Sequence, residues 1–167
     1  MKKITPLIDL GNNRYREKIG LDYDNFEPGM VIEHWPGRTI TETDNIWFSL
    51  LCLNAHPTHI DNEYARTTEF KKALVNSPLV LSIITGMSVK SFSGQAIANL
   101  GWDKVKLPAP VFVGDTLYAE SEILSKRHSK SRENNGIVII RSTGFNQHKE
   151  TVITFERAFI MPLTKEL

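Results

Sequence analysis

The spacing of hydrophobic positions changes from a helical to a strand-like period along this chain. Apolar residues recur at three- and four-residue intervals from Ile46 to Leu51, which predicts an amphipathic helix with this stripe on its core face. Thr41 or Thr43 can cap its N-terminus. The helix has to end before Pro57, because a residue that precedes proline disfavours helical geometry.

A second, longer helix is predicted for residues 76–92. Ser77 is a suitable N-cap, and Pro78 suits the first helical position, where the missing N–H costs nothing. Apolar residues between 79 and 89 cover almost every side, so we expect other parts of the protein to surround this helix. A short surface helix or turn is expected within 61–72.

Strand-like patterns lie on both sides of these helices. Residues 30–41 predict a short strand broken at Pro36-Gly37. Four further strand-like runs, separated by turn residues, follow at 95–107, 116–128, 136–147 and 151–163. The pattern predicts an α+β fold with helices first and an antiparallel meander afterwards. A long curved sheet around one apolar helix is the hot-dog arrangement, and its open edge favours pairing with a second copy.

Length and composition place the chain among ordinary globular proteins. Its 167 residues suit one domain, which we expect at 26–163 after a lead-in at 1–25. Lys and Arg number 20 against 19 Asp and Glu, which argues against nucleic acid as a partner. We expect no membrane span and a cytoplasmic location, since the longest apolar stretch is too short to cross a bilayer. Cys52 is the only cysteine, so no intrachain disulfide can form, and we expect a buried structural thiol.

The segment FSLLCLNAHPTHIDNEYA, residues 48–65, resembles the signature of the MaoC-like, R-specific enoyl-CoA hydratases. In that signature an aromatic residue is followed by small or apolar residues, Gly, Asp, any residue, Asn, Pro, an aliphatic residue and His, with Ala or Ser six positions later. The matching positions here are Leu53 for Gly, Asn54 for Asp, His56 for Asn, Pro57, Thr58 for the aliphatic residue, His59 and Ala65. The frame of the signature is therefore kept, with its aspartate replaced.

The resemblance extends over roughly residues 26–160, through PGMVIEHWPGRTITETD, LVNSPLVLSIITGMSV and VGDTLYAESEILSKRHSKSR. It is strongest to hydratases of short branched dicarboxylic thioesters such as itaconyl-CoA or mesaconyl-CoA. It implies a hot-dog fold and a hydro-lyase that adds water reversibly to an α,β-unsaturated acyl-CoA. It also implies a homodimer or higher homo-oligomer, with coenzyme A as part of the substrate and no other cofactor.

The resemblance assigns roles to three residues of this chain. His59 would be the base that takes a proton from water, Asn54 would hold that water, and the backbone N–H of Ser77 would stabilise the enolate oxygen. An amide cannot exchange a proton at neutral pH, so the replacement at Asn54 leaves two possibilities. Either His59 takes and returns the proton itself, or His56 supplies a second titrating group.

Basic residues in two places are candidates for the substrate's anionic groups. Lys126, Lys130 and Arg132 lie in a run near a predicted hairpin turn and could meet the phosphates of coenzyme A. They could equally be a solvated strand edge that prevents unwanted pairing. Arg38 is a second candidate, for a phosphate or for a distal carboxylate of the substrate.

Other readings of the same residues stay open. Asn54 could be a helix C-cap and His59 an ordinary hydrogen-bonded histidine. A metal site could combine His56, His59, Asp61 and the distant His34, although hydration of an enoyl thioester needs no metal. The same fold could carry an acyl-CoA thioesterase, or a catalytically silent subunit that binds acyl-CoA or acyl carrier.

Overall fold

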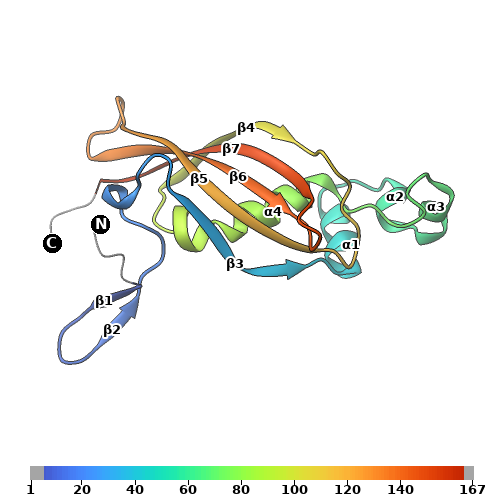
Figure 1. The fold of residues 1–167 in the computed structure, drawn as a ribbon, viewed down its shortest axis with the longest axis horizontal. Helices are drawn as coiled ribbons and strands as arrows, with labels where there is room; N and C mark the ends of the chain where they lie inside the picture. The colour runs from blue at the N-terminus through green and yellow to red at the C-terminus, as the bar shows by residue number, and fades with distance from the viewer. Residues whose placement is uncertain (1–5, 164–167) are drawn as a thin grey trace.

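A computed structural model describes residues 6–163 and shows one central helix against a five-stranded antiparallel sheet (Figure 1). The strands are β3 (Val31–Thr39), β4 (Ala98–Lys106), β5 (Thr116–His128), β6 (Asn135–Phe145) and β7 (Thr151–Pro162). The central helix is α4 (Ser77–Met87). The predicted α+β hot-dog fold is confirmed, as are the four strand-like runs after residue 95.

The strand order corrects the predicted meander. The order is β3-β5-β6-β7-β4, so only β5, β6 and β7 follow one another as a meander. β4 pairs with β7 at one edge, and the chain then crosses to β5, which lies beside β3 at the other edge. Strand spacing predicts where strands are, but a long connection such as 107–115 leaves their neighbours open.

The first part of the chain forms a small separate hairpin. β1 (Leu7–Asp9) pairs with β2 (Tyr15–Glu17), and both strands are exposed. A 3-10 helix, η1 (Tyr23–Asn25), then leads into β3. The expected lead-in at 1–25 thus includes this hairpin, while residues 1–5 lie outside the described part of the chain.

The β3 strand is continuous, although the sequence predicted a break. The strand is nine residues long, and residues 31–34 and 38–39 pair with β5, with a register shift between His34 and Arg38, around Pro36-Gly37. A bulge accommodates the proline, because β3 is an edge strand and needs no N–H at every position. The predicted break therefore appears as a local irregularity within one strand.

The first helix, α1 (Glu42–Leu51), begins at the predicted cap but buries the opposite face. Thr41 and Asp44 form a capping box at its N-terminus. The stripe predicted to face the core is largely exposed: Trp47 is 69% exposed and Leu51 78%. The wholly buried residues of α1 are both polar, Asn45 and Ser49, and they belong to a buried network of hydrogen bonds. The hydrophobic period predicted the helix correctly, but the apolar face that it marks does not contact the core.

Two short helices, α2 (Pro57–Ile60) and α3 (Asn62–Thr67), follow α1; α3 confirms the short helix expected within 61–72, whereas α2 was not predicted. The central helix starts one residue earlier than expected, because Asn76 is the N-cap and Ser77 the first helical residue. After Met87 the chain continues through a π-helical segment, η2 (Val89–Ser93).

The surroundings of α4 differ from the prediction that other elements enclose it. Leu79, Val80 and Ile84 are buried against the sheet. A stripe of small or polar residues at Pro78, Ser82 and Gly86 is exposed. Within the described chain, the helix is therefore covered on its apolar side only.

A glycine of β6 allows α4 to approach the sheet closely. A Cβ added at Gly144 would lie 2.8 Å from side-chain atoms of Ile84 and of Ile153. This spacing is closer than real Cβ contacts allow, so any larger residue would push the helix away. The main core cluster lies here, between α4 and the strands.

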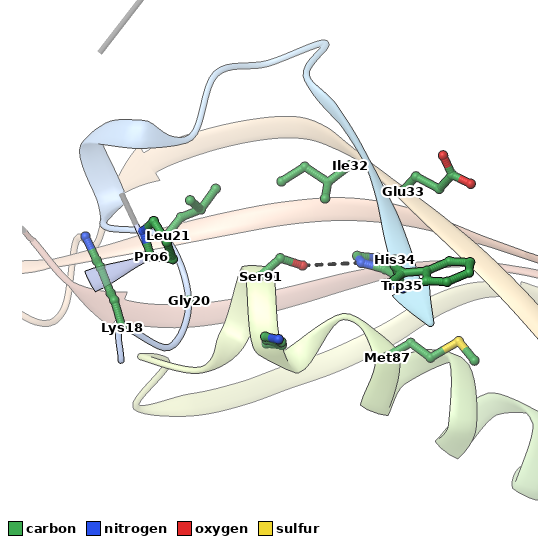
Figure 2. A pocket seen from close by; sticks show the side chains of 11 residues that line it. Pro6, Lys18, Gly20, Leu21, Ile32, Glu33, His34, Trp35, Met87 and Ser91 are labelled. Carbon is green, nitrogen blue, oxygen red and sulfur yellow. Dashed lines mark hydrogen bonds between the residues drawn. The ribbon is translucent and has the colours of Figure 1, made fainter. Parts of the chain in front are cut away.

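Polar side chains link η2 to the sheet, and Figure 2 shows the contact between Ser91 of η2 and His34 of β3. His34 Nε2 lies 2.8 Å from Ser121 Oγ, and His34 Nδ1 lies 3.2 Å from Ser91 Oγ. Burial, together with the smaller effect of the nearby Arg157 guanidinium, lowers the pKa of His34 to about 4. His34 also lines a cavity of about 340 Å³ with Trp35 and other residues.

Two further predictions concern the burial of Cys52 and the absence of a membrane span. Cys52 is exposed at the end of α1, so the prediction of a buried thiol is wrong. It follows the last helical residue, where the chain turns away from the core. No helix in residues 6–163 is long and apolar enough to cross a membrane.

Candidate active site

The end of α1 fixes the backbone of Asn54. The N–H of Leu53 donates to Leu50 O at 3.0 Å, and the N–H of Asn54 donates to Ser49 O at 2.8 Å. These two bonds form a Schellman motif, which requires a left-handed residue after the C-cap. Leu53 takes this position with φ 57° and is 90% exposed. Glycine suits this conformation better, so Leu53 is held there at a cost in backbone strain.

The Asn54 side chain is oriented by the next turn. Its Oδ1 accepts a hydrogen bond from the backbone N–H of His56 at 3.3 Å. Because a backbone N–H can only donate, the amide nitrogen Nδ2 points elsewhere, and it donates to no acceptor within residues 6–163. Cys52, not Asn54, is the C-cap of α1, so the side chain of Asn54 does not serve as that cap.

The hydrogen bonds of His56 and His59 define complementary tautomers. His59 Nδ1 lies 2.8 Å from the carbonyl oxygen of Leu74, which can only accept, so Nδ1 carries the proton and neutral Nε2 has a free lone pair. His56 Nδ1 accepts from the backbone N–H of Thr58 at 3.2 Å, so its proton lies on Nε2. The two ring centroids are 6.1 Å apart. The site therefore offers one nitrogen lone pair and one N–H from neighbouring rings.

A buried amide network lies behind His59. The amide of Asn45 donates to the carbonyl oxygens of His59 and Leu74, at 2.9 and 3.1 Å, and accepts from the backbone N–H of Asn76 at 2.9 Å. Asn76 Nδ2 donates to Ser49 Oγ at 3.1 Å, and both side chains are buried. Sequence reasoning missed these residues. The available signal was the i, i+4 pair of Asn45 and Ser49 on one face of a helix.

The N-terminus of α4 opens on an apolar cavity of about 290 Å³, lined by Phe70, Leu74, Val75, Ser77, Val80, Leu107, Pro108, Ala109, Pro110 and Val111. The Ser77 N–H donates to no acceptor in residues 6–163, and Pro78 has no N–H to offer. The cavity therefore combines an apolar wall with one free donor at the positive end of a helix dipole.

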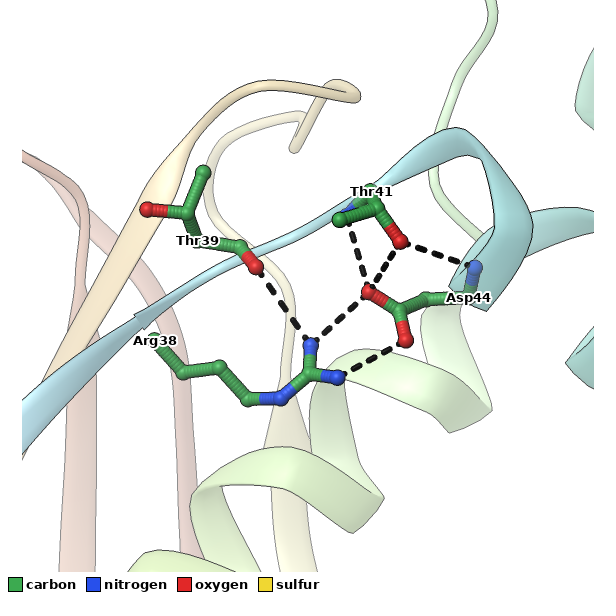
Figure 3. A network of polar contacts seen from close by, with 4 residues as sticks. All are labelled: Arg38, Thr39, Thr41 and Asp44. Atoms are coloured by element: carbon green, nitrogen blue, oxygen red, sulfur yellow. Dashed lines mark hydrogen bonds and ion pairs between the residues drawn. The ribbon is translucent and has the colours of Figure 1, made fainter.

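Arg38 is bound to the start of α1 (Figure 3). Its guanidinium makes two bonds to the Asp44 carboxylate, NH1 to Oδ2 at 2.9 Å and NH2 to Oδ1 at 2.7 Å. This bond raises the pKa of Arg38 and holds the pKa of Asp44 well below its usual range. Arg38 thus supports the capping box, and its expected contact with a substrate anion stays a prediction.

The other basic candidates lie away from the histidines. Lys130 and Arg132 are exposed in the hairpin between β5 and β6, at the end of the molecule opposite to α2 and α3 (Figure 1). Lys126 donates to the carbonyl oxygen of Tyr23 at 3.2 Å and lies over the Tyr23 ring. The structure therefore does not bring these three residues together with His59 in one chain.

The residues of the alternative metal site are also separated by their contacts. Asp61 caps α3 by accepting from the backbone N–H groups of Glu63 and Tyr64. His34 is buried with Ser121. Within the described residues, no group of three or more His, Cys, Asp or Glu side chains is placed to hold a metal ion.

Comparison with known proteins places this fold and site in a family. The model of the MaoC like domain matches residues 24–144, which is more than half of the chain. A beta-methylmalyl-CoA dehydratase from Chloroflexus aurantiacus is 33% identical over 81% of the chain. A mesaconyl-CoA hydratase from Cereibacter sphaeroides is 30% identical over 83%. The chain belongs to the MaoC-like dehydratase family.

The match covers most of this chain but less than half of each relative. The matched regions are 38% and 40% of the two relatives, so the chain spans about two fifths of their length. Among solved structures, a Mycobacterium tuberculosis protein with a double hot-dog fold superposes with a TM-score of 0.80 at 22% identity, over 89% of this chain and 46% of that one. This likeness concerns the fold alone, and it agrees with one hot-dog unit here.

Proposed function

We propose that this protein is a hydro-lyase that adds water reversibly to the double bond of an α,β-unsaturated acyl-CoA. The observation that carries this proposal is the bond from His59 Nδ1 to Leu74 O, which in the neutral ring puts the proton on Nδ1 and makes Nε2 available as a base. Asn54 lies in the preceding turn, and its amide N–H group donates to no acceptor within residues 6–163. Activation of water requires a base and a donor that holds the water, and His59 and Asn54 would supply these two groups.

The proposed reaction balances with one titrating group. His59 Nε2 takes a proton from water while the water oxygen bonds to the β-carbon, and the double-bond electrons move to the thioester oxygen. The imidazolium then returns the proton to the α-carbon, and the thioester carbonyl is restored. His56, whose Nε2 carries a proton, is the alternative donor for this second step.

Asn54 acts in this scheme as a donor and not as an acid. Its Nδ2 would hold the water oxygen while a proton of that water points to His59 Nε2. This role needs no proton exchange by the amide, so it tolerates Asn54 where the family signature has an aspartate. Reaction through a single histidine is the expected consequence.

The start of α4 supports stabilisation of the enolate. Ser77, whose N–H donates to no acceptor in residues 6–163, lines the apolar cavity at the positive end of the helix dipole. A developing negative charge on the thioester oxygen would accept this hydrogen bond. The apolar cavity would take the acyl chain.

The substrate class and assembly extend this proposal. The two curated relatives are named for beta-methylmalyl-CoA and mesaconyl-CoA, which supports a short branched dicarboxylic acyl-CoA as substrate. A homodimer is supported by the exposed apolar face of α1 and by the outer edge of β4, which pairs with no strand of residues 6–163. A partner would also cover exposed sides of the site. The phosphate-binding roles of Lys126, Lys130 and Arg132, and the cytoplasmic location, stay predictions.

A panel of enoyl-CoA thioesters tests the proposal. Loss of the conjugated chromophore and release of free thiol are followed separately on the full chain. Chromophore loss without thiol is the expected result. Thiol release would instead identify a thioesterase, and binding without either change would identify a silent acyl-CoA-binding subunit.

A further inference from the structure

The amide of Asn45 joins three segments that are distant in sequence. It is fully buried on α1, and each of its hydrogen-bonding atoms is used. Its Nδ2 reaches the carbonyl oxygens of His59 and Leu74, while its Oδ1 accepts from the backbone of Asn76. One side chain thus holds the base, the carbonyl that orients the base, and the residue that precedes the central helix.

The Leu74 carbonyl is shared between two donors. It accepts from Asn45 Nδ2 at 3.1 Å and from His59 Nδ1 at 2.8 Å, which uses both of its lone pairs. In the same peptide unit, the N–H of Val75 donates to Val111 O at 2.8 Å. Because this peptide is held on both sides, its carbonyl direction is fixed, and the plane of the imidazole that donates to it follows.

The same amide sets the start of α4. Asn45 Oδ1 binds the backbone N–H of Asn76, and the next N–H along the chain belongs to Ser77. The Asn45 side chain therefore links the segment that carries the His59 ring to the segment that carries the Ser77 N–H. An apolar residue at position 45 would leave these main-chain groups without their partner, and aspartate would set an oxygen against two carbonyl oxygens.

We infer that Asn45 is a positioning residue, which holds the His59 imidazole in its Nδ1–H tautomer and in register with the N-terminus of the central helix. Its catalytic consequence rests on the proposed hydration. The effect of Asn45 on the His59 tautomer does not rest on the proposed hydration, and it can be observed without any substrate. Outer partners of this kind commonly change rates by about 10- to 100-fold when they are removed.

Two variants separate positioning from folding. Asn45→Ser shortens the side chain and loses all three bonds, whereas Asn45→Asp keeps an acceptor for Asn76 and loses both donors. Val138→Ala is the control, because Val138 lies in the second core cluster, which contains neither Asn45 nor His59. ¹⁵N chemical shifts of the His59 ring report the tautomer, and kcat and KM are measured on folded protein.

In the unmodified protein we expect the Nδ1–H tautomer at His59. In both Asn45 variants we expect a mixture of tautomers and a kcat lower by about 10- to 100-fold, with KM changed far less. Val138→Ala should lose stability but keep the tautomer. If folded Asn45 variants keep the tautomer and kcat of the unmodified protein, the inference is overturned.

The inference would also be overturned if Asn45→Asp, but not Asn45→Ser, kept the tautomer and kcat of the unmodified protein. In that case only the bond to Asn76 would matter. Should the unmodified protein hydrate no thioester, the proposed function fails separately, and the ring tautomer still decides the role of Asn45.

Discussion

His59 Nδ1 and the carbonyl oxygen of Leu74 lie 2.8 Å apart, although the two residues are 15 positions apart in the chain. Because a carbonyl can only accept, this single distance fixes which ring nitrogen of His59 is free. The free nitrogen is Nε2, on the side of the ring away from Leu74. The proposed chemistry follows from this relationship and from the amide of Asn54 in the preceding turn.

The role of Asn54 predicts different results for two substitutions. Asn54→Ala removes the donor that would hold water, and kcat should fall by about 10- to 100-fold. Asn54→Asp adds a titrating carboxyl beside His59, so the pH–rate profile should gain a further limb. Steady-state kinetics across pH measures both. If neither variant changes the rate or the profile, Asn54 has no part in the reaction.

Arg38 should contribute to stability more than to substrate binding. Arg38→Gln removes both bonds to Asp44 at the cap of α1, and we expect a loss of about 1 kcal/mol in the free energy of unfolding, with KM changed less than about twofold. Urea denaturation and kinetics measure the two effects. A tenfold rise in KM at unchanged stability would assign Arg38 to a substrate anion instead.

His34 should make the protein less stable in acid. Its pKa is about 4 in the folded state against an ordinary value of 6.5, so the unfolded chain takes up the proton first as the pH falls. Stability should therefore decrease between about pH 6.5 and pH 4, by at most about 3 kcal/mol, since one pKa unit corresponds to about 1.4 kcal/mol.

The non-titrating His34→Gln variant provides the comparison for this prediction. Free energies of unfolding are measured at several pH values for both proteins, and the difference isolates His34 from carboxylates that titrate in both. Buried Arg157, the charge that faces His34, should keep its proton across this window. Parallel pH dependences in the two proteins would contradict the prediction.

Leu53 predicts a substitution that stabilises the protein. It is held at φ 57° with an exposed side chain, so Leu53→Gly relieves strain and loses little burial. After the greater flexibility of glycine in the unfolded chain is included, we expect a gain of about 0.5–1 kcal/mol. Leu53→Ala is the control, because it shortens the side chain but keeps the strain. Equal effects of Gly and Ala would contradict this account.

The sequence predicted most of the fold because the relevant patterns are local. Strand periods, the capping threonine of α1 and the apolar run of α4 each depend on neighbouring residues. The position of β4 beside β7 could not be predicted, since a nine-residue connection can reach either edge. The buried face of α1 was also mispredicted, because its polar side chains bind main-chain groups that only the folded chain brings near.

The site was predictable in part for the same reason. Asn54, His56 and His59 belong to one short motif, and the fold keeps them in one short segment, from the turn after α1 into α2. The contributions of Leu74 and Asn45 arise from contacts across 15 and 14 residues, and nothing in the local sequence marks a main-chain carbonyl as the partner of a histidine.

The most direct test compares the unmodified protein with a His59→Gln variant on a short enoyl-CoA. Glutamine keeps a polar side chain but cannot act as a base, and circular dichroism checks that the variant is folded. The account predicts hydration without thiol release by the unmodified protein, and a kcat at least about 100-fold lower for the variant. Hydration at an undiminished rate by folded His59→Gln would contradict it.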